Sequence, residues 1–154
     1  MDPLRKPGEG SATPALPGAS PPLRIFIVEN HEDTRFLLSL LLEQLGHTVF
    51  SAATMGDALA EIPAAHCDVL ISDIGLPDGD GWTLMTTLAD GQPRYAIAMS
   101  GFGQTSDRQR SLGVGYRHHL LKPVEPNQLE NLLDEAAHEL RNDERRRQET
   151  AQGS

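Results

Sequence analysis

The chain has 154 residues, enough for one domain with a substantial core. Acidic residues outnumber basic ones 22 to 13, and the resulting net charge of −9 argues against binding to nucleic acid or to anionic membranes. No apolar run is as long as a membrane span, and the N-terminus lacks the apolar core of a signal peptide. The single Cys67 cannot form an internal disulfide, so we expect a reducing, cytoplasmic compartment.

The chain begins with a leader, residues 1–22, whose Pro-, Gly-, Ala- and Ser-rich composition predicts disorder. An apolar strand is expected next, from Arg24 to Val28, and it ends on Glu29 and Asn30. In residues 33–45 the apolar side chains recur at three-and-four spacing, which predicts an amphipathic helix that ends before a glycine.

A short strand is expected over residues 47–51, followed by a helix that Thr54 caps and that Pro63 stops after Ile62. The most apolar strand, residues 68–72, lies within the stretch CDVLISDIGLPDGDG, and it ends on Asp73 before a cluster of turn-forming residues.

The second half of the chain continues the alternation. Its expected elements are a helix over 81–89, a strand over 94–99 that ends on Ser100, a short polar helix over 105–112, a strand over 116–121 that ends on Lys122, and a helix from about Pro126. The charged tail, residues 142–154, is expected to fray.

Five strands that alternate with five helices predict an α/β fold, a doubly wound parallel sheet with helices on both faces. We expect the flavodoxin-like strand order 2-1-3-4-5 and a single domain over residues 23–141.

Polar side chains follow four of the five expected strands. Because the carboxyl ends of parallel strands meet at one edge of a sheet, Glu29, Asn30, Asp73, Ser100 and Lys122 are expected to converge there. Taken alone, Asp73 is better explained as the start of a turn or as a helix cap. Together with the others it favours a site, since two carboxylates and an amide oxygen suit Mg²⁺ or Mn²⁺. Lysine and serine side chains beside such a cation suit a transferred phosphoryl group, for which an aspartate can be the nucleophile.

Four motifs carry a resemblance that covers residues 24 to about 141: IFIVENHEDTRFLL, LISDIGLPDGDGW, AMSG and HLLKPVEP. They resemble the receiver domain of two-component response regulators, and the stretches around the last two resemble receivers of hybrid histidine kinases. The resemblance implies that Asp73 accepts a phosphoryl group from a sensor histidine kinase or a phosphotransfer protein. It also implies that Mg²⁺ is held by Glu29, Asn30, Asp73 and the backbone carbonyl of Gly75.

The same resemblance assigns the remaining roles. Ser100 supplies the hydroxyl that moves onto the phosphoryl group, Lys122 is its ion-pair partner, and the bond to Pro123 is cis. Such a protein is no enzyme toward a separate substrate, because it catalyses only its own phosphorylation and dephosphorylation. We expect the dephosphorylation to be slow, since neither Gly75 nor Phe102 has a side chain that can hydrogen-bond the attacking water.

The sequence departs from the family pattern at two positions. Asn30 stands where an aspartate is usual, which predicts weaker Mg²⁺ binding without abolishing it. The switch position, usually tyrosine or phenylalanine, is His119, whose charge near neutral pH is hypothesised to bias the switch together with Ser100. A half-exposed strand histidine without a switching role is an equal alternative.

Other functions stay open at this point. One is a pseudo-receiver, a binding module that Asn30 has deprived of its metal and that is never phosphorylated. A metal-dependent aspartyl phosphatase is disfavoured because nothing supplies a second catalytic acid. The glycines around Phe102 do not complete a dinucleotide-binding motif, so no nucleotide cofactor is expected. The resemblance implies a protein partner at the face of the fourth helix and fifth strand, and leaves homodimerisation open.

Overall fold

The computed structural model of the chain describes residues 21–101 and 105–152. Almost all of the expected leader therefore lies outside the described residues, and so does Phe102, on which part of the dephosphorylation hypothesis depends.

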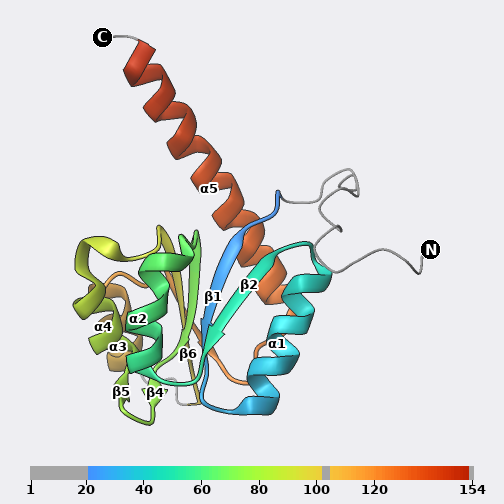
Figure 1. Cartoon of the computed structure of the whole chain (residues 1–154), viewed down its shortest axis with the longest axis vertical. Helices are drawn as coiled ribbons and strands as arrows, with labels where there is room; N and C mark the ends of the chain where they lie inside the picture. The colour runs from blue at the N-terminus through green and yellow to red at the C-terminus, as the bar shows by residue number, and fades with distance from the viewer. Residues whose placement is uncertain (1–20, 102–104, 153–154) are drawn as a thin grey trace, which may run out of the picture.

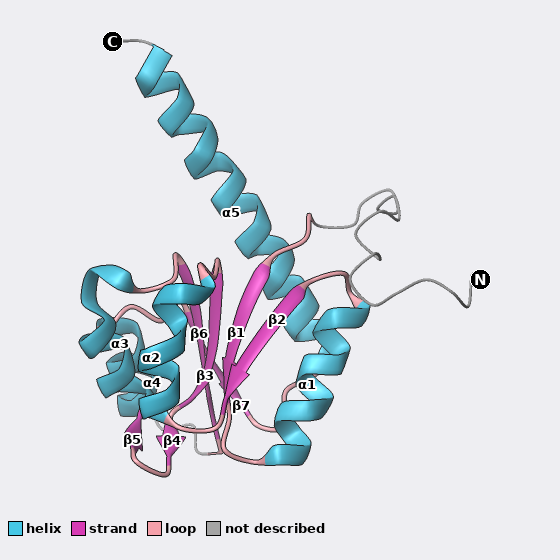
Figure 2. Ribbon diagram, viewed as in Figure 1, coloured by secondary structure: helices cyan, strands magenta, loops and turns pink. Residues whose placement is uncertain are grey.

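The centre of the molecule is a five-stranded parallel sheet, in the order β2-β1-β3-β6-β7 (Figure 2). This is the predicted 2-1-3-4-5 order once the two short strands β4 and β5, which lie outside the sheet, are left out of the count. The strands are β1 Arg24–Val28, β2 Thr48–Ala52, β3 Val69–Asp73, β6 Tyr95–Ser100 and β7 His118–Leu121.

Helices cover both faces of this sheet, as the alternation predicted (Figure 1). The helices are α1 Glu32–Gln44, α2 Met55–Ala65, α3 Gly81–Leu88, α4 Thr105–Gly113 and α5 Pro126–Gln152. Side chains of α1 and α5 share one apolar core with alternate strand residues such as Ile27 and Ile71. Side chains of α2 and α3 share a second core with the intervening residues, such as Phe26 and Leu70. The period of two along each strand thus supplies both cores.

The segment after Asp73, expected to be a loop, contains a two-stranded antiparallel hairpin formed by β4 Gly75–Leu76 and β5 Gly79–Asp80. Asp78 at its turn fixes the hairpin to α2, because its two carboxylate oxygens accept hydrogen bonds from the backbone N–H groups of Met55 and Gly56, each at 2.8 Å. These bonds satisfy two of the N–H groups left over at the start of α2.

The prediction that Pro63 stops the second helix is wrong. Thr54 is the N-cap, as expected, and its side chain accepts a hydrogen bond from the N–H of Asp57, but α2 continues past Pro63 to Ala65. A proline in the last turn removes only one backbone hydrogen bond. The carbonyl of Ala65, at the helix end, is compensated by the Arg24 guanidinium, whose Nη2 donates to it at 2.8 Å.

The prediction that the tail beyond Asn142 frays is also wrong, because α5 continues to Gln152. Buried residues of α5 end at Leu140, and the remaining turns extend beyond the amino ends of the strands (Figure 1). The extension lacks glycine and proline and is rich in strong helix formers, and Asp143 and Arg147 stand at a favourable four-residue spacing. Among the helices of the described ranges, we find none with the length and apolarity needed to cross a membrane.

Candidate functional site

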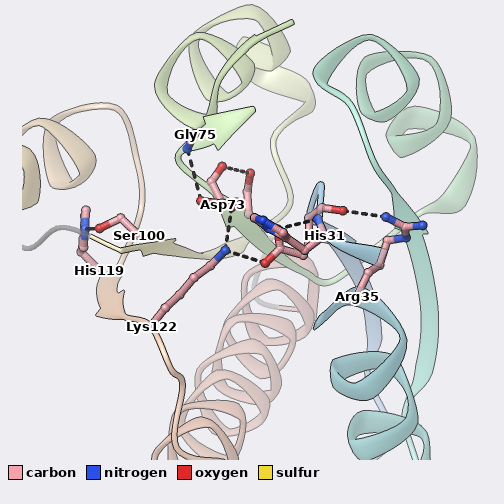
Figure 3. A network of polar contacts seen from close by, with 9 residues as sticks. His31, Arg35, Asp73, Gly75, Ser100, His119 and Lys122 are labelled. Carbon is pink, nitrogen blue, oxygen red and sulfur yellow. Dashed lines mark hydrogen bonds and ion pairs between the residues drawn. The ribbon is translucent and has the colours of Figure 1, made fainter. Parts of the chain in front are cut away.

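The carboxyl edge of the sheet brings together three charged side chains from three strand ends. Lys122 follows β7, Glu29 follows β1, and Asp73 is the last residue of β3. The Lys122 Nζ donates to Glu29 Oε1 at 2.5 Å and to Asp73 Oδ2 at 2.7 Å (Figure 3). One ammonium group therefore lies between two carboxylates. These are the same two carboxylates that the sequence predicted as ligands of a divalent cation.

This cluster is buried and carries an unbalanced charge. Glu29 is fully buried, Asp73 is 7% exposed and the Lys122 side chain is 23% exposed. With all three groups ionised the net charge is about −1, in surroundings that screen charge poorly. The cluster is therefore a place where a further positive charge would be stabilised.

The two carboxylates respond differently to these surroundings. Burial raises the pKa of Asp73, the Lys122 ammonium opposes this rise, and the nearby Glu29 carboxylate adds to it. Burial also acts to raise the pKa of Glu29, but hydrogen bonds, above all the one from Lys122, outweigh it and hold that pKa below its usual value. The pKa of Lys122 is raised, because its two carboxylate partners outweigh the opposing effect of burial.

Backbone contacts fix the orientation of both carboxylates. The second oxygen of Asp73, Oδ1, accepts a hydrogen bond from the N–H of Gly75 at 3.2 Å. Oε2 of Glu29 accepts one from the N–H of His31 at 3.3 Å, and Arg35 Nη1 donates to the Glu29 backbone carbonyl at 2.9 Å (Figure 3). Arg35 and His31 were not among the predicted site residues, and nothing in their spacing distinguishes them from an ordinary helix start.

The donor set at this edge suits a hard divalent cation. Both side chains that face Lys122 are carboxylates, and the charge left over is negative. Within residues 21–101 and 105–152, no three His, Cys, Asp or Glu side chains gather in a way that could hold a metal. Further ligands would thus be amide or backbone oxygens, as the sequence predicted for Asn30, which is exposed beside Glu29, and for the carbonyl of Gly75.

Ser100 and His119 lie on the other side of Lys122, on the neighbouring strands β6 and β7. The Oγ of Ser100 and the Nε2 of His119 are 2.7 Å apart. The bond between Lys122 and Pro123 is cis, as the resemblance implied. His119 points toward Ser100, while the adjacent His118 contacts Glu135 of α5 on the other face.

A cavity of about 400 Å³ opens over the site. Asp73, Ser100, His119 and Lys122 contribute to its lining, so these four side chains share one space. The lining also includes residues that the sequence did not assign to a site, among them His31, Trp82 and Asp107.

Comparison with known proteins identifies the family. The model of the response regulator receiver domain matches residues 25–134. The chain belongs to this family. In the solved structures, a CheY-like receiver domain protein of Methanospirillum hungatei is 28% identical with a TM-score of 0.75, and the match covers 80% of this chain and 99% of that one.

The curated relatives differ in length. An uncharacterized 14.6 kDa protein of Leptolyngbya boryana is 33% identical, with 72% of this chain and 87% of that protein covered. The KDP operon transcriptional regulatory protein KdpE of Escherichia coli is also 33% identical, over 71% of this chain but 48% of its own length. The sensor protein EvgS of the same species is 31% identical, over 66% of this chain and 9% of its own length. The chain thus spans most of one relative but half or less of the others.

Proposed function

We propose that this receiver domain accepts a phosphoryl group on Asp73 from the phosphohistidine of a sensor histidine kinase or a phosphotransfer protein. The observation that carries the proposal is the single Lys122 ammonium between the buried Asp73 and Glu29 carboxylates. Such an arrangement leaves one negative charge over and so favours a bound cation. It also keeps a positive group beside the oxygen on which a phosphoryl group would arrive.

The proposed reaction is a displacement at phosphorus. An Asp73 carboxylate oxygen forms the new O–P bond, the P–N bond of the phosphohistidine breaks, and its electron pair returns to the donor imidazole. Lys122 neutralises part of the charge on the phosphoryl oxygens and holds the Asp73 carboxylate in place, and Ser100 donates a hydrogen bond to one of those oxygens. Mg²⁺ or Mn²⁺, held by Glu29, Asn30, Asp73 and the Gly75 carbonyl, would supply further charge neutralisation at the same oxygens.

We further propose that the phosphorylated protein is recognised by a partner protein at the face formed by α4 and β7, which are the fourth helix and fifth sheet strand. A groove of about 540 Å³ lies there, and Leu112, Leu121 and Arg108 contribute to its lining. Two of these side chains are apolar yet exposed, Leu112 at 56% and Leu121 at 43%. The groove suits another protein chain, whether a different partner or a second copy, better than a nucleic acid, given the net charge of −9.

The acceptor function is favoured over the pseudo-receiver alternative because the acidic residues that remain, Glu29 and Asp73, still contact Lys122. We propose that the protein turns over no separate substrate and acts in the cytoplasm, where a histidine kinase would supply the phosphoryl group.

The test is intact mass after incubation with a small-molecule phosphodonor, with and without Mg²⁺, for the wild type and Asp73→Asn. The expected result is a gain of one phosphoryl mass that requires both Mg²⁺ and Asp73. A folded protein that gains no mass under any condition would favour the pseudo-receiver, and Asn30→Asp would then show whether the missing carboxylate is the reason.

A further inference from the structure

A chain of hydrogen bonds runs from Ser100 away from the acceptor site. His119 Nε2 lies 2.7 Å from Ser100 Oγ, and its other nitrogen, Nδ1, lies 2.8 Å from Ser111 Oγ of α4. The indole Nε1 of Trp82, on α3, donates to the same Ser111 Oγ at 2.9 Å. Four side chains from four different elements are therefore linked, and three of them, Ser100, His119 and Trp82, line the cavity over Asp73.

The chemistry of these groups decides which atom donates and which accepts in each of these hydrogen bonds. An indole nitrogen can only donate, so Ser111 Oγ accepts from Trp82 and has one proton of its own to give. Ser111 is fully buried, so bulk water does not take that proton. In the described part of the protein, its Oγ has hydrogen bonds with Trp82 and His119 alone. The Ser111 proton therefore goes to His119 Nδ1, which must be the unprotonated nitrogen of a neutral ring.

The direction continues to the acceptor site. If Nδ1 of His119 accepts, the ring proton is on Nε2, and Nε2 donates to Ser100 Oγ. Ser100 Oγ is then the acceptor in its hydrogen bond with His119, and its own proton points away from the imidazole ring. We infer that Trp82 and Ser111 are positioning residues: by fixing the ring proton of His119 on Nε2, they keep the Ser100 hydroxyl as a donor toward a phosphoryl group on Asp73. This inference rests on the proposed function for its last step only.

Trp82 is well placed to set this direction. The Arg110 guanidinium lies over its ring, 4.0 Å from the centroid, and Arg110 is the neighbour of Ser111 in α4. This contact keeps the indole against α4, so that its N–H stays aimed at Ser111. Trp82 is thus more than one of the partly buried side chains that pack against the second apolar core.

The first experiment measures the tautomer in the wild-type protein, unphosphorylated and free of added metal. ¹⁵N chemical shifts of the His119 imidazole, at about pH 8, above the usual histidine pKa, report which nitrogen carries the proton. The expected result is a proton on Nε2 and a bare Nδ1. A proton on Nδ1, or on both nitrogens, would overturn the inference without any variant having to fold.

The second experiment removes the donors one at a time. In the wild type, the Trp82 N–H keeps the Ser111 proton from turning toward residue 82. Trp82→Phe keeps a ring but loses the N–H, so the Ser111 proton can turn that way while its oxygen accepts from His119, and a mixture of tautomers is expected. Ser111→Ala removes the group that donates to Nδ1. For both variants we expect phosphorylation by the small-molecule phosphodonor to slow about 3- to 10-fold, the effect of losing one hydrogen bond. Ser39→Ala is the matched control, since Ser39 is also a helical serine, whose Oγ donates to the Arg35 carbonyl outside this chain of bonds.

The readouts separate this inference from the proposed function. Failure of the wild type to gain a phosphoryl mass would refute the proposed function, whatever the tautomer. A wild type that is phosphorylated but has the wrong tautomer would refute the inference alone. Trp82→Phe with an unchanged tautomer and an unchanged phosphorylation rate would also refute it. Ser111→Thr keeps the hydroxyl, so recovery of both the tautomer and the rate in this variant would support a positioning role over a packing one.

Discussion

The two ends of the same parallel sheet hold their polar side chains in different ways. At the amino end, two polar side chains pair with backbone: His47 Nδ1 accepts from the N–H of Leu23 at 3.0 Å, and Asp68 Oδ2 accepts from the N–H of Arg24 at 2.9 Å. At the carboxyl end the charged groups pair with one another, two carboxylates to a single Lys122.

This difference in pairing indicates that the polar groups at the amino end serve stability and those at the carboxyl end serve function. His47 and Asp68 are each matched to one backbone N–H group, so removing either side chain costs about one hydrogen bond. The carboxyl end keeps two acids around one base in a buried setting, an arrangement that stability alone does not favour. Buried charge without a matching partner is typical of sites that bind ions or carry out chemistry.

Lys122→Met should have the largest effect on stability. It would leave Glu29 and Asp73 facing each other without a cation, and we expect a loss of about 3 kcal/mol in the free energy of unfolding, measured in urea. Adding Asp73→Asn to Lys122→Met should restore a large part of this loss, because it removes one of the two unpaired charges. If Lys122→Met alone were as stable as the wild type, the two carboxylates at the carboxyl end would not repel each other appreciably.

Asn30→Asp should raise Mg²⁺ affinity by about tenfold, since an exposed unit charge about 4 Å from a divalent cation contributes on the order of 1 to 2 kcal/mol. Isothermal titration calorimetry measures the change. Asn142→Asp adds the same charge far from the site, on the extension of α5, and is the matched control. Equal affinity in the two variants would exclude residue 30 from the cation site.

His47 should make stability depend on pH at the amino end. Burial lowers its pKa, with the charge of Asp134 partly opposing this, so the unfolded chain takes up the proton more readily than the folded one. This contribution is complete above the usual histidine pKa of about 6.5 and is lost as pH falls below it. When the pH is lowered from about 7.5 to about 5.5, we expect the free energy of unfolding of the wild type to fall by about 1 kcal/mol more than that of His47→Gln. Equal losses in urea unfolding would contradict this role.

The part of α5 that extends beyond the amino ends of the strands should contribute least to stability. Arg146→Gly weakens a helix segment in which none of residues 141–150 has a buried side chain, so we expect the global free energy of unfolding to change by less than about 0.3 kcal/mol. Ala137→Gly, in the buried half of the same helix, should cost at least about 1 kcal/mol. Equal effects would show that the extension packs on the body of the domain.

Much of this architecture can be read from the sequence. Apolar runs such as 24–28 and 68–72 have the length and composition of buried parallel strands, and each is followed by a polar residue where the strand ends. Because the strands are parallel, these ends had to meet, which is why Glu29, Asp73 and Lys122 could be grouped before their contacts were known.

The missed features lack such a signal. The β4 and β5 strands are two residues each, too short for any period to appear. The extension of α5 has no apolar stripe, so only its helix propensity could have predicted it. The link from Trp82 to Ser111 joins residues 29 positions apart through one hydroxyl, and spacing along the chain cannot reveal a contact of that kind.

The most direct test of this contrast is the free energy of unfolding of Asp73→Asn, measured in urea at neutral pH without Mg²⁺. We expect this variant to be at least as stable as the wild type, because Lys122 would then pair with one carboxylate in place of two. A loss of about 2 kcal/mol or more would contradict it, since such a loss would mean that the carboxyl end, like the amino end, is built for stability.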